Sequence, residues 1–259
     1  MRLLVFVPVL AIVLVAAACS SGNDDDAGGQ VESLAPLPTG VNTELLIGML
    51  ERLEAARDAT YKVVYDFGSQ PELGMMNATL TIVQKPPLLR TEVVDTTGGP
   101  ALAFIGSSEG TVACRGEAGI TSYECYETSA FMRTSPLAVT SDDLLAIADS
   151  LRKAQIYYSF AQSDQEIAGV KATCLTATAS EELPDAIRER VGTQAELCAS
   201  QDGVPLVIET NGGDADFSVR ATEYTTDVSD AEFTAPGPVS AGVPNFQVPV
   251  APDVVPEGS

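Results

Sequence analysis

Apolar residues first recur at helical spacing and then, over most of the chain, at every second position. An apolar stripe with intervals of three and four residues predicts an amphipathic helix, and Asn42 or Thr43 can cap its start. This stripe consists of Leu46, Met49, Leu50 and Leu53. A second helix is predicted over residues 141–151, opened by Ser141, and a short third helix around residues 184–191.

Alternation with period two predicts a series of strands, each with one apolar face. The predicted strands cover residues 61–67, 77–82, 89–95, 101–105, 110–114, 122–127, 170–178, 206–209 and 217–222. Proline and glycine clusters at residues 85–87, 98–100, 201–203 and 211–213 separate several of them and predict turns. The order helix, meander, helix, meander predicts an α+β domain, an antiparallel sheet with helices on one face.

The N-terminus has the layout of an export signal. Arg2 precedes an apolar run over residues 3–15, and three alanines then lead to Cys19. The run is shorter than the roughly 20 residues that span a bilayer. Small residues directly before a cysteine resemble the lipobox of bacterial lipoproteins, although Ala16 stands where leucine is usual. Residues 1–18 are therefore predicted to be a lipoprotein signal peptide and Cys19 the acylated residue; the alternative is an ordinary signal peptide followed by a cysteine.

Both ends of the mature chain have the composition of linkers. Residues 19–40 combine the predicted lipidated cysteine with a flexible acidic stretch, and residues 236–259 contain six prolines with almost no charge, which predicts a disordered tail. The region between them, residues 41–235, is long enough for one domain with a sizeable core.

Four cysteines remain once Cys19 is set aside: Cys114, Cys125, Cys174 and Cys198. An even number in an exported chain predicts two disulfides. Three pairings are possible, and the short separations favour Cys114 with Cys125 and Cys174 with Cys198. A zinc site is the rival interpretation, but the chain has no histidine and no CxxC motif.

The charge excludes several functions. Lys and Arg total 14 against 36 Asp and Glu, a net charge of −22, so neither nucleic-acid binding nor electrostatic attraction to an anionic membrane is expected. The acidic residues are spread along the chain, as solubility requires.

Catalytic and metal motifs are weak. Residues 106–110 fit G-x-S-x-G around Ser108, but no histidine can serve as its base. Neither residues 24–26 nor Asp214 with Asp216 has EF-hand spacing, and the glycosylation sequon at Asn77 falls on a predicted strand. No catalytic residue, metal or cofactor is therefore expected, and the protein is predicted not to be an enzyme.

Several stretches together resemble one superfamily, the LolA/LolB lipoprotein-localisation factors and the mycobacterial LppX/LprG lipoproteins. They are ATYKVVYDF, QKPPLLRTEV, IAGVKATCLTAT with AELCASQDGVPLVIET, and the closing ATEYTTDVSDAEFTAPGP. The resemblance covers approximately residues 41–238. It implies a curved antiparallel half-barrel whose concave apolar face is covered by helices, leaving a cavity that holds acyl chains in members of the family.

The resemblance also implies where a ligand would bind. The apolar phases of the strands would line the cavity, with Tyr61, Val63, Tyr65, Leu80, Ile82, Phe217 and Val219 as tentative ligand-binding residues. The expected function is that of an exported lipoprotein, anchored to the outer face of the cell membrane or envelope by acyl chains, that binds or carries a lipid or other hydrophobic ligand. The alternative is a non-enzymatic sensor or interaction module in which the same residues form a filled core.

Overall fold

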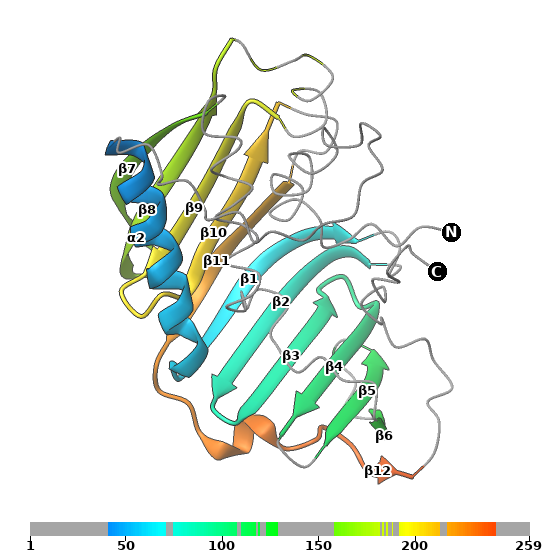
Figure 1. The fold of residues 1–259 in the computed structure, drawn as a ribbon. Helices are drawn as coiled ribbons and strands as arrows, with labels where there is room; N and C mark the ends of the chain where they lie inside the picture. The colour runs from blue at the N-terminus through cyan, green and yellow to red at the C-terminus, as the bar shows by residue number, and fades with distance from the viewer. Residues whose placement is uncertain are drawn as a thin grey trace, which may run out of the picture.

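The computed structural model describes residues 41–70, 75–107, 110–117, 119, 123–128, 158–181, 183, 185, 188, 192–212 and 217–241. These residues form one large, curved sheet with a single helix packed on one of its faces (Figure 1). The chain enters this region through the helix α2 (Val41–Ala55), which continues into the 3-10 turn η1 (Ala56–Asp58).

Two antiparallel meanders follow. The first consists of β1 (Tyr61–Gln70), β2 (Met75–Lys85), β3 (Leu88–Asp95), β4 (Pro100–Gly106), β5 (Thr111–Glu117) and β6 (Glu124–Thr128). The second consists of β7 (Tyr158–Ile167), β8 (Val170–Ala179), β9 (Gln194–Ser200), β10 (Pro205–Asn211) and β11 (Phe217–Thr225). The 3-10 turn η3 (Asp230–Phe233) and the short strand β12 (Val239–Ser240) end the described part of the chain.

One seam joins the two meanders into a twelve-stranded sheet. The strand order is β12-β6-β5-β4-β3-β2-β1-β11-β10-β9-β8-β7, so β1 pairs with β2 on one side and with β11 on the other. All pairs are antiparallel except β12 with β6. In the described residues the sheet is open, with β7 at one edge and β12 at the other.

The predicted helix at residues 46–53 and the predicted strands are confirmed, and the curved, open, mainly antiparallel sheet agrees with the expected half-barrel. The sequence pattern does not predict β7, because only Phe160 and Ile167 are buried along it and the alternating pattern is therefore absent. The predicted helix at residues 141–151 and most of the one at residues 184–191 lie outside the described residues. Among the described residues, α2 is therefore the one α-helix that packs on the sheet.

The C-terminal segment runs past residue 235, where the sequence pattern places the end of the domain, and still belongs to the sheet. It crosses one end of β1–β3. Two ion pairs hold it there, one between Lys62 and Glu232 (Nζ–Oε1 3.0 Å) and one between Lys85 and Asp230 (Nζ–Oδ1 2.6 Å). It then adds β12 parallel to β6. The tail predicted from residue 236 therefore begins with packed residues, and residues 242–259 lie outside the description.

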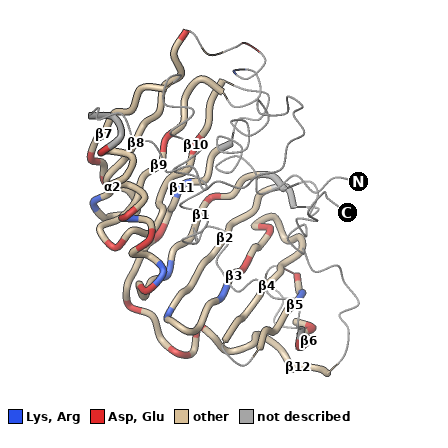
Figure 2. Tube along the Cα trace, viewed as in Figure 1, with Lys and Arg blue, Asp and Glu red and all other residues tan. Residues whose placement is uncertain are grey.

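Charged positions are distributed over the whole described fold and are not gathered on one element (Figure 2). Several cations pair with neighbouring carboxylates, such as Arg90 with Glu92 (Nη2–Oε2 2.9 Å) and Arg220 with Glu209 (Nη2–Oε1 3.3 Å).

Candidate functional site

Six of the seven side chains expected to line a cavity are buried in one hydrophobic cluster. They are Tyr61, Val63, Tyr65, Leu80, Ile82 and Val219, none of them more than 4% exposed. The register explains their meeting, since Tyr65 lies opposite Leu80 and Val63 opposite Ile82 across β1 and β2. Phe217 begins β11, and its side chain lies outside the described residues. These six residues therefore share one face and pack against one another.

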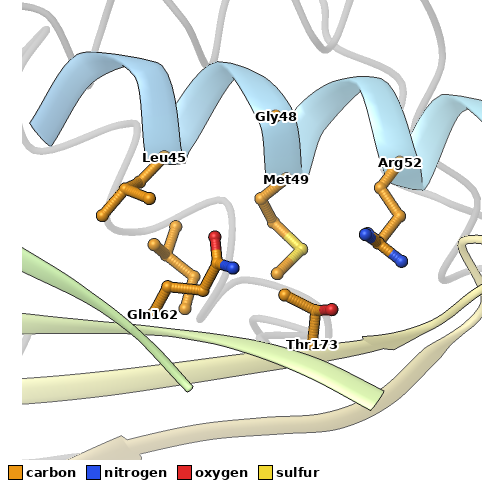
Figure 3. A pocket seen from close by; sticks show the side chains of 7 residues that line it. Leu45, Gly48, Met49, Arg52, Gln162 and Thr173 are labelled. Atoms are coloured by element: carbon orange, nitrogen blue, oxygen red, sulfur yellow. The ribbon is translucent and has the colours of Figure 1, made fainter. Parts of the chain in front are cut away.

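A pocket of about 100 Å³ lies elsewhere on the fold, between α2 and the strands β7 and β8. Its walls are formed by Leu45, Gly48, Met49, Arg52, Gln162, Thr173 and Leu175. Figure 3 shows the side chains of Leu45, Met49 and Arg52 directed from the helix toward the sheet. A dry apolar cavity of roughly 150 Å³ is sufficient to bind benzene, so this α2 pocket has room for a small apolar group.

The α2 pocket lies beside the buried stripe through which the helix packs on the sheet, and an exposed glycine forms part of its rim. Buried Leu46, Met49 and Leu53 contact a cluster on β7, β8 and β9. Gly48 is exposed beside this buried stripe, and a Cβ built there has no neighbour within 4 Å. A glycine inside a helix costs about 0.5–1 kcal/mol relative to alanine, and here it leaves space at the mouth of the pocket.

The lining of the α2 pocket divides into an apolar part and a polar part. Leu45, Met49 and Leu175 supply the apolar wall. Arg52 lies two helical turns after Leu45, and its Nη1 donates a long hydrogen bond of 3.4 Å to the carbonyl oxygen of Ser200. The arrangement suits a ligand with an apolar segment and a polar end.

The C-terminal end of α2 is held tightly to the sheet. The side-chain amide of buried Gln84 on β2 lies 2.7 Å from the Ala56 carbonyl oxygen and 3.0 Å from that of Ala59. In the turn between β9 and β10, Gly203 (φ +83°) packs against the Arg52 carbonyl so closely that a Cβ there would overlap it. One wall of the α2 pocket is therefore fixed by backbone contacts.

Both favoured disulfides are present. Cys114 pairs with Cys125 and Cys174 with Cys198, in each case between residues directly opposite on adjacent strands. Glu196 lies close to the second pair and accepts a hydrogen bond of 2.8 Å from Gln165 Nε2. A disulfide sulfur is no thiolate ligand, so Cys174, Cys198 and Glu196 do not make a zinc site.

Two tyrosines that are wholly or partly buried have raised pKa values, and these make the stability of the fold depend on pH in the alkaline range. Burial raises the pKa of Tyr65 well above its usual value, helped by the nearby Tyr61 and Tyr224, and its hydroxyl donates to the Pro205 carbonyl at 2.6 Å. Burial also raises the pKa of Tyr224 to about 12; the hydrogen bond and charge of Asp202 add to this rise, while a hydrogen bond with Ser200 opposes it.

Stability is expected to fall as the pH rises above about 10, the ordinary pKa of tyrosine. There the unfolded chain ionises and releases protons that the folded chain retains, so unfolding becomes more favourable. Tyr65→Phe removes one such group and one hydrogen bond. It should cost about 1 kcal/mol near neutral pH, and this cost should shrink as the pH passes 10. Urea midpoints of both proteins across that range test the expectation, which a constant difference would contradict.

Of the other residues that the sequence motifs single out, most lie outside the described residues. Cys19, Ser108, Asp214 and Asp216 lie outside the described residues. Asn77 is exposed on β2. Arg52, Gln162 and Thr173 are not singled out by the sequence, although a glycine at position 48, within an apolar helical stripe, is a usable signal. No helix in the described ranges is long and apolar enough to cross a membrane.

Comparison with known proteins gives structural neighbours only. No protein-family model matches the chain, and no curated protein matches it in sequence. Among solved structures, it is similar to an uncharacterized conserved protein from Thermus thermophilus, with a TM-score of 0.38 and 10% identity over 76% of this chain and 99% of that one. It is also similar to the Mycobacterium tuberculosis lipoprotein LppX, with a TM-score of 0.38 and 11% identity over 72% of this chain and 98% of that one. LppX is one of the lipoproteins that the sequence resembles.

Proposed function

We propose that this protein is an exported, membrane-anchored lipoprotein that binds the apolar part of a hydrophobic ligand between α2 and the sheet. The observation that carries the proposal is the α2 pocket, a space with an apolar wall of Leu45, Met49 and Leu175. Each buried CH₂ group contributes about 0.8 kcal/mol. A few methylene groups in this space therefore supply useful affinity.

The size of the α2 pocket defines the mode of binding. About 100 Å³ accommodates the end of an alkyl chain and not a whole lipid. The six buried residues of β1, β2 and β11 are each at most 4% exposed and pack into one hydrophobic cluster. A longer chain can enter only if α2 moves away from β7 and β8, while Gln84 and Gly203 hold its C-terminal end.

The anchor and the location belong to the same proposal. Two disulfides favour an oxidising, extracytoplasmic compartment. Acylation of Cys19 would hold the chain at the membrane, and stable attachment needs more than one acyl chain. The full-length protein should therefore sediment with membranes, and Cys19→Ser should release it to the soluble fraction; equal sedimentation of both would contradict the anchor.

Native mass spectrometry on the exported full-length chain carrying Cys19→Ser tests ligand binding, because its own acyl chains are then absent. We expect an adduct with the mass of a lipid, either carried from the host or acquired from added lipid. Gly48→Leu should reduce the adduct, since the added side chain begins in open space beside the pocket, and it should also raise helix stability by up to about 1 kcal/mol.

Ile47→Phe is the matched control, because Ile47 is exposed on the same helix and does not line the α2 pocket. This variant should bind as the parent does. Equal loss in both variants would point to a general effect on α2. A clean apo mass after incubation with lipids would contradict ligand binding.

One observation favours a second function, that of a sensor or interaction module. Six of the seven side chains expected to line a cavity are packed with almost no exposure, as in a filled core. Such a protein would bind no lipid and would act through its surface. Crosslinking of the anchored protein in cells to one specific partner, together with a clean apo mass, would favour this module over the carrier.

A further inference from the structure

We propose that the α2 pocket selects single-chain amphiphiles with an anionic head, held by Arg52. The inference builds on the proposed function, because it names the chemical class of the ligand for the same pocket. Leu45, Met49 and Arg52 lie on one side of α2 and point toward the sheet (Figure 3). The seven residue steps from Leu45 to Arg52 correspond to about 10 Å along a helix, so about two helical turns separate the apolar and cationic ends of the pocket wall.

Arg52 has donors to offer such a head group. A guanidinium carries five N–H donors, and the contact described for Arg52 is the long bond from Nη1 to the Ser200 carbonyl at 3.4 Å. Among the described residues it forms no ion pair with a carboxylate, whereas Arg57 pairs with Glu54 in the next turn. In a chain with a net charge of −22, a half-buried cation beside an apolar pocket is a specific attraction for an anion.

The other polar residues of the pocket offer an anion less than Arg52 does. The amide of Gln162 is a second donor on β7. The hydroxyl of Thr173 on β8 donates to Asp164 at 3.3 Å, so this hydroxyl is already engaged and a negative charge lies behind it. The C-terminal end of a helix also carries a partial negative charge. Anion binding therefore depends on Arg52, and loss of its charge should remove the preference.

Matched probes separate this inference from the proposed function. The full-length Cys19→Ser protein is titrated calorimetrically with dodecanoate and with dodecan-1-ol, which share a chain and differ in charge. We expect dodecanoate to bind at least about tenfold more tightly, the lower range for a hydrogen bond to a charged group. Arg52→Met should reduce the affinity for dodecanoate to about that for dodecan-1-ol, and Arg52→Lys should restore part of the preference.

Arg57→Met is the control for charge on the same segment, because Arg57 lies in η1 and does not line the pocket. It should retain the preference for dodecanoate. Equal binding of the two probes by the parent, or a preference that survives Arg52→Met, would overturn the anionic-head proposal and leave hydrophobic binding intact. Failure of both probes to bind would overturn the proposed function as well.

Two further probes identify the source of the anionic head. Lysophosphatidylglycerol presents an anionic phosphodiester on one chain, and dodecanoate presents a carboxylate. Tighter binding of either one supports the proposal and distinguishes a membrane lipid from a free fatty acid. Acetate, which has the charge without the chain, should not bind measurably, and tight acetate binding would overturn the assignment of an amphiphile.

Discussion

Gly203→Ala is expected to lower the free energy of unfolding by about 2–5 kcal/mol and to abolish ligand binding in the α2 pocket. Two costs add. Alanine with a positive φ costs roughly 1–2 kcal/mol, and relief of an overlap in a packed region costs typically about 1–3 kcal/mol more. The overlap is with the Arg52 carbonyl, so the structure can relieve it only by moving α2 or the turn between β9 and β10. Urea denaturation and native mass spectrometry measure the two effects.

Gly98→Ala separates these two costs. Gly98 also has a positive φ (+95°), but a Cβ at this position has no neighbour within 4 Å. It should therefore lose only the backbone part, about 1–2 kcal/mol, and retain ligand binding. If Gly203→Ala and Gly98→Ala proved equally destabilised and equally able to bind, the close contact with Arg52 would not be what fixes α2.

Removal of the Cys174–Cys198 disulfide is the second change with a large expected effect. The chain-entropy relation gives about 3 kcal/mol for a loop of this length, and the bridged residues are 24 apart. The double variant Cys174→Ala with Cys198→Ala should lower the free energy of unfolding by this amount. Alanine is chosen over serine because both cysteines are fully buried, and a serine there would bury a hydroxyl group. The urea midpoint of the oxidised parent and of the double variant gives the comparison.

The Cys114–Cys125 disulfide supplies the matched control, since it also joins opposite residues on adjacent strands but spans only 11 residues. Its double alanine variant should lose about 0.7 kcal/mol less, from the logarithm of the loop lengths. It lies in the other meander, so ligand binding should persist. Binding should weaken only without Cys174–Cys198, which joins the two strands β8 and β9 beneath α2. Equal loss of binding in both would contradict a local role.

The sequence pattern predicted the helix and strands that have one buried face and one more exposed face. Alternation along residues 61–67 and 77–82 identified β1 and β2 because one face of each is buried and the other is not. β7 carries no such pattern, since an edge strand with four consecutive exposed residues shows no periodicity. The short separations of the four cysteines were enough to favour the pairing that the structure contains.

The candidate site was less predictable than the fold. Alternation places Tyr61, Val63 and Tyr65 on one face, but it cannot tell a filled core from an open cavity, because both need the same apolar residues. The α2 pocket depends on how the helix seats against β7 and β8. Arg52, Gln162 and Thr173 come to line one pocket only through that docking, which local sequence patterns do not encode.

The seam between β1 and β11 has a consequence for the order in which the chain folds. Val63 lies opposite Tyr224, so the pairing that unites the sheet joins residues from the beginning and the end of the domain. Contacts of such long sequence separation form slowly, because a large loop must close before they contribute. Each meander can pair its own strands early, because those strands are neighbours in sequence. β1, however, keeps an open edge until the last long strand arrives, and the complete sheet cannot be assembled one strand at a time.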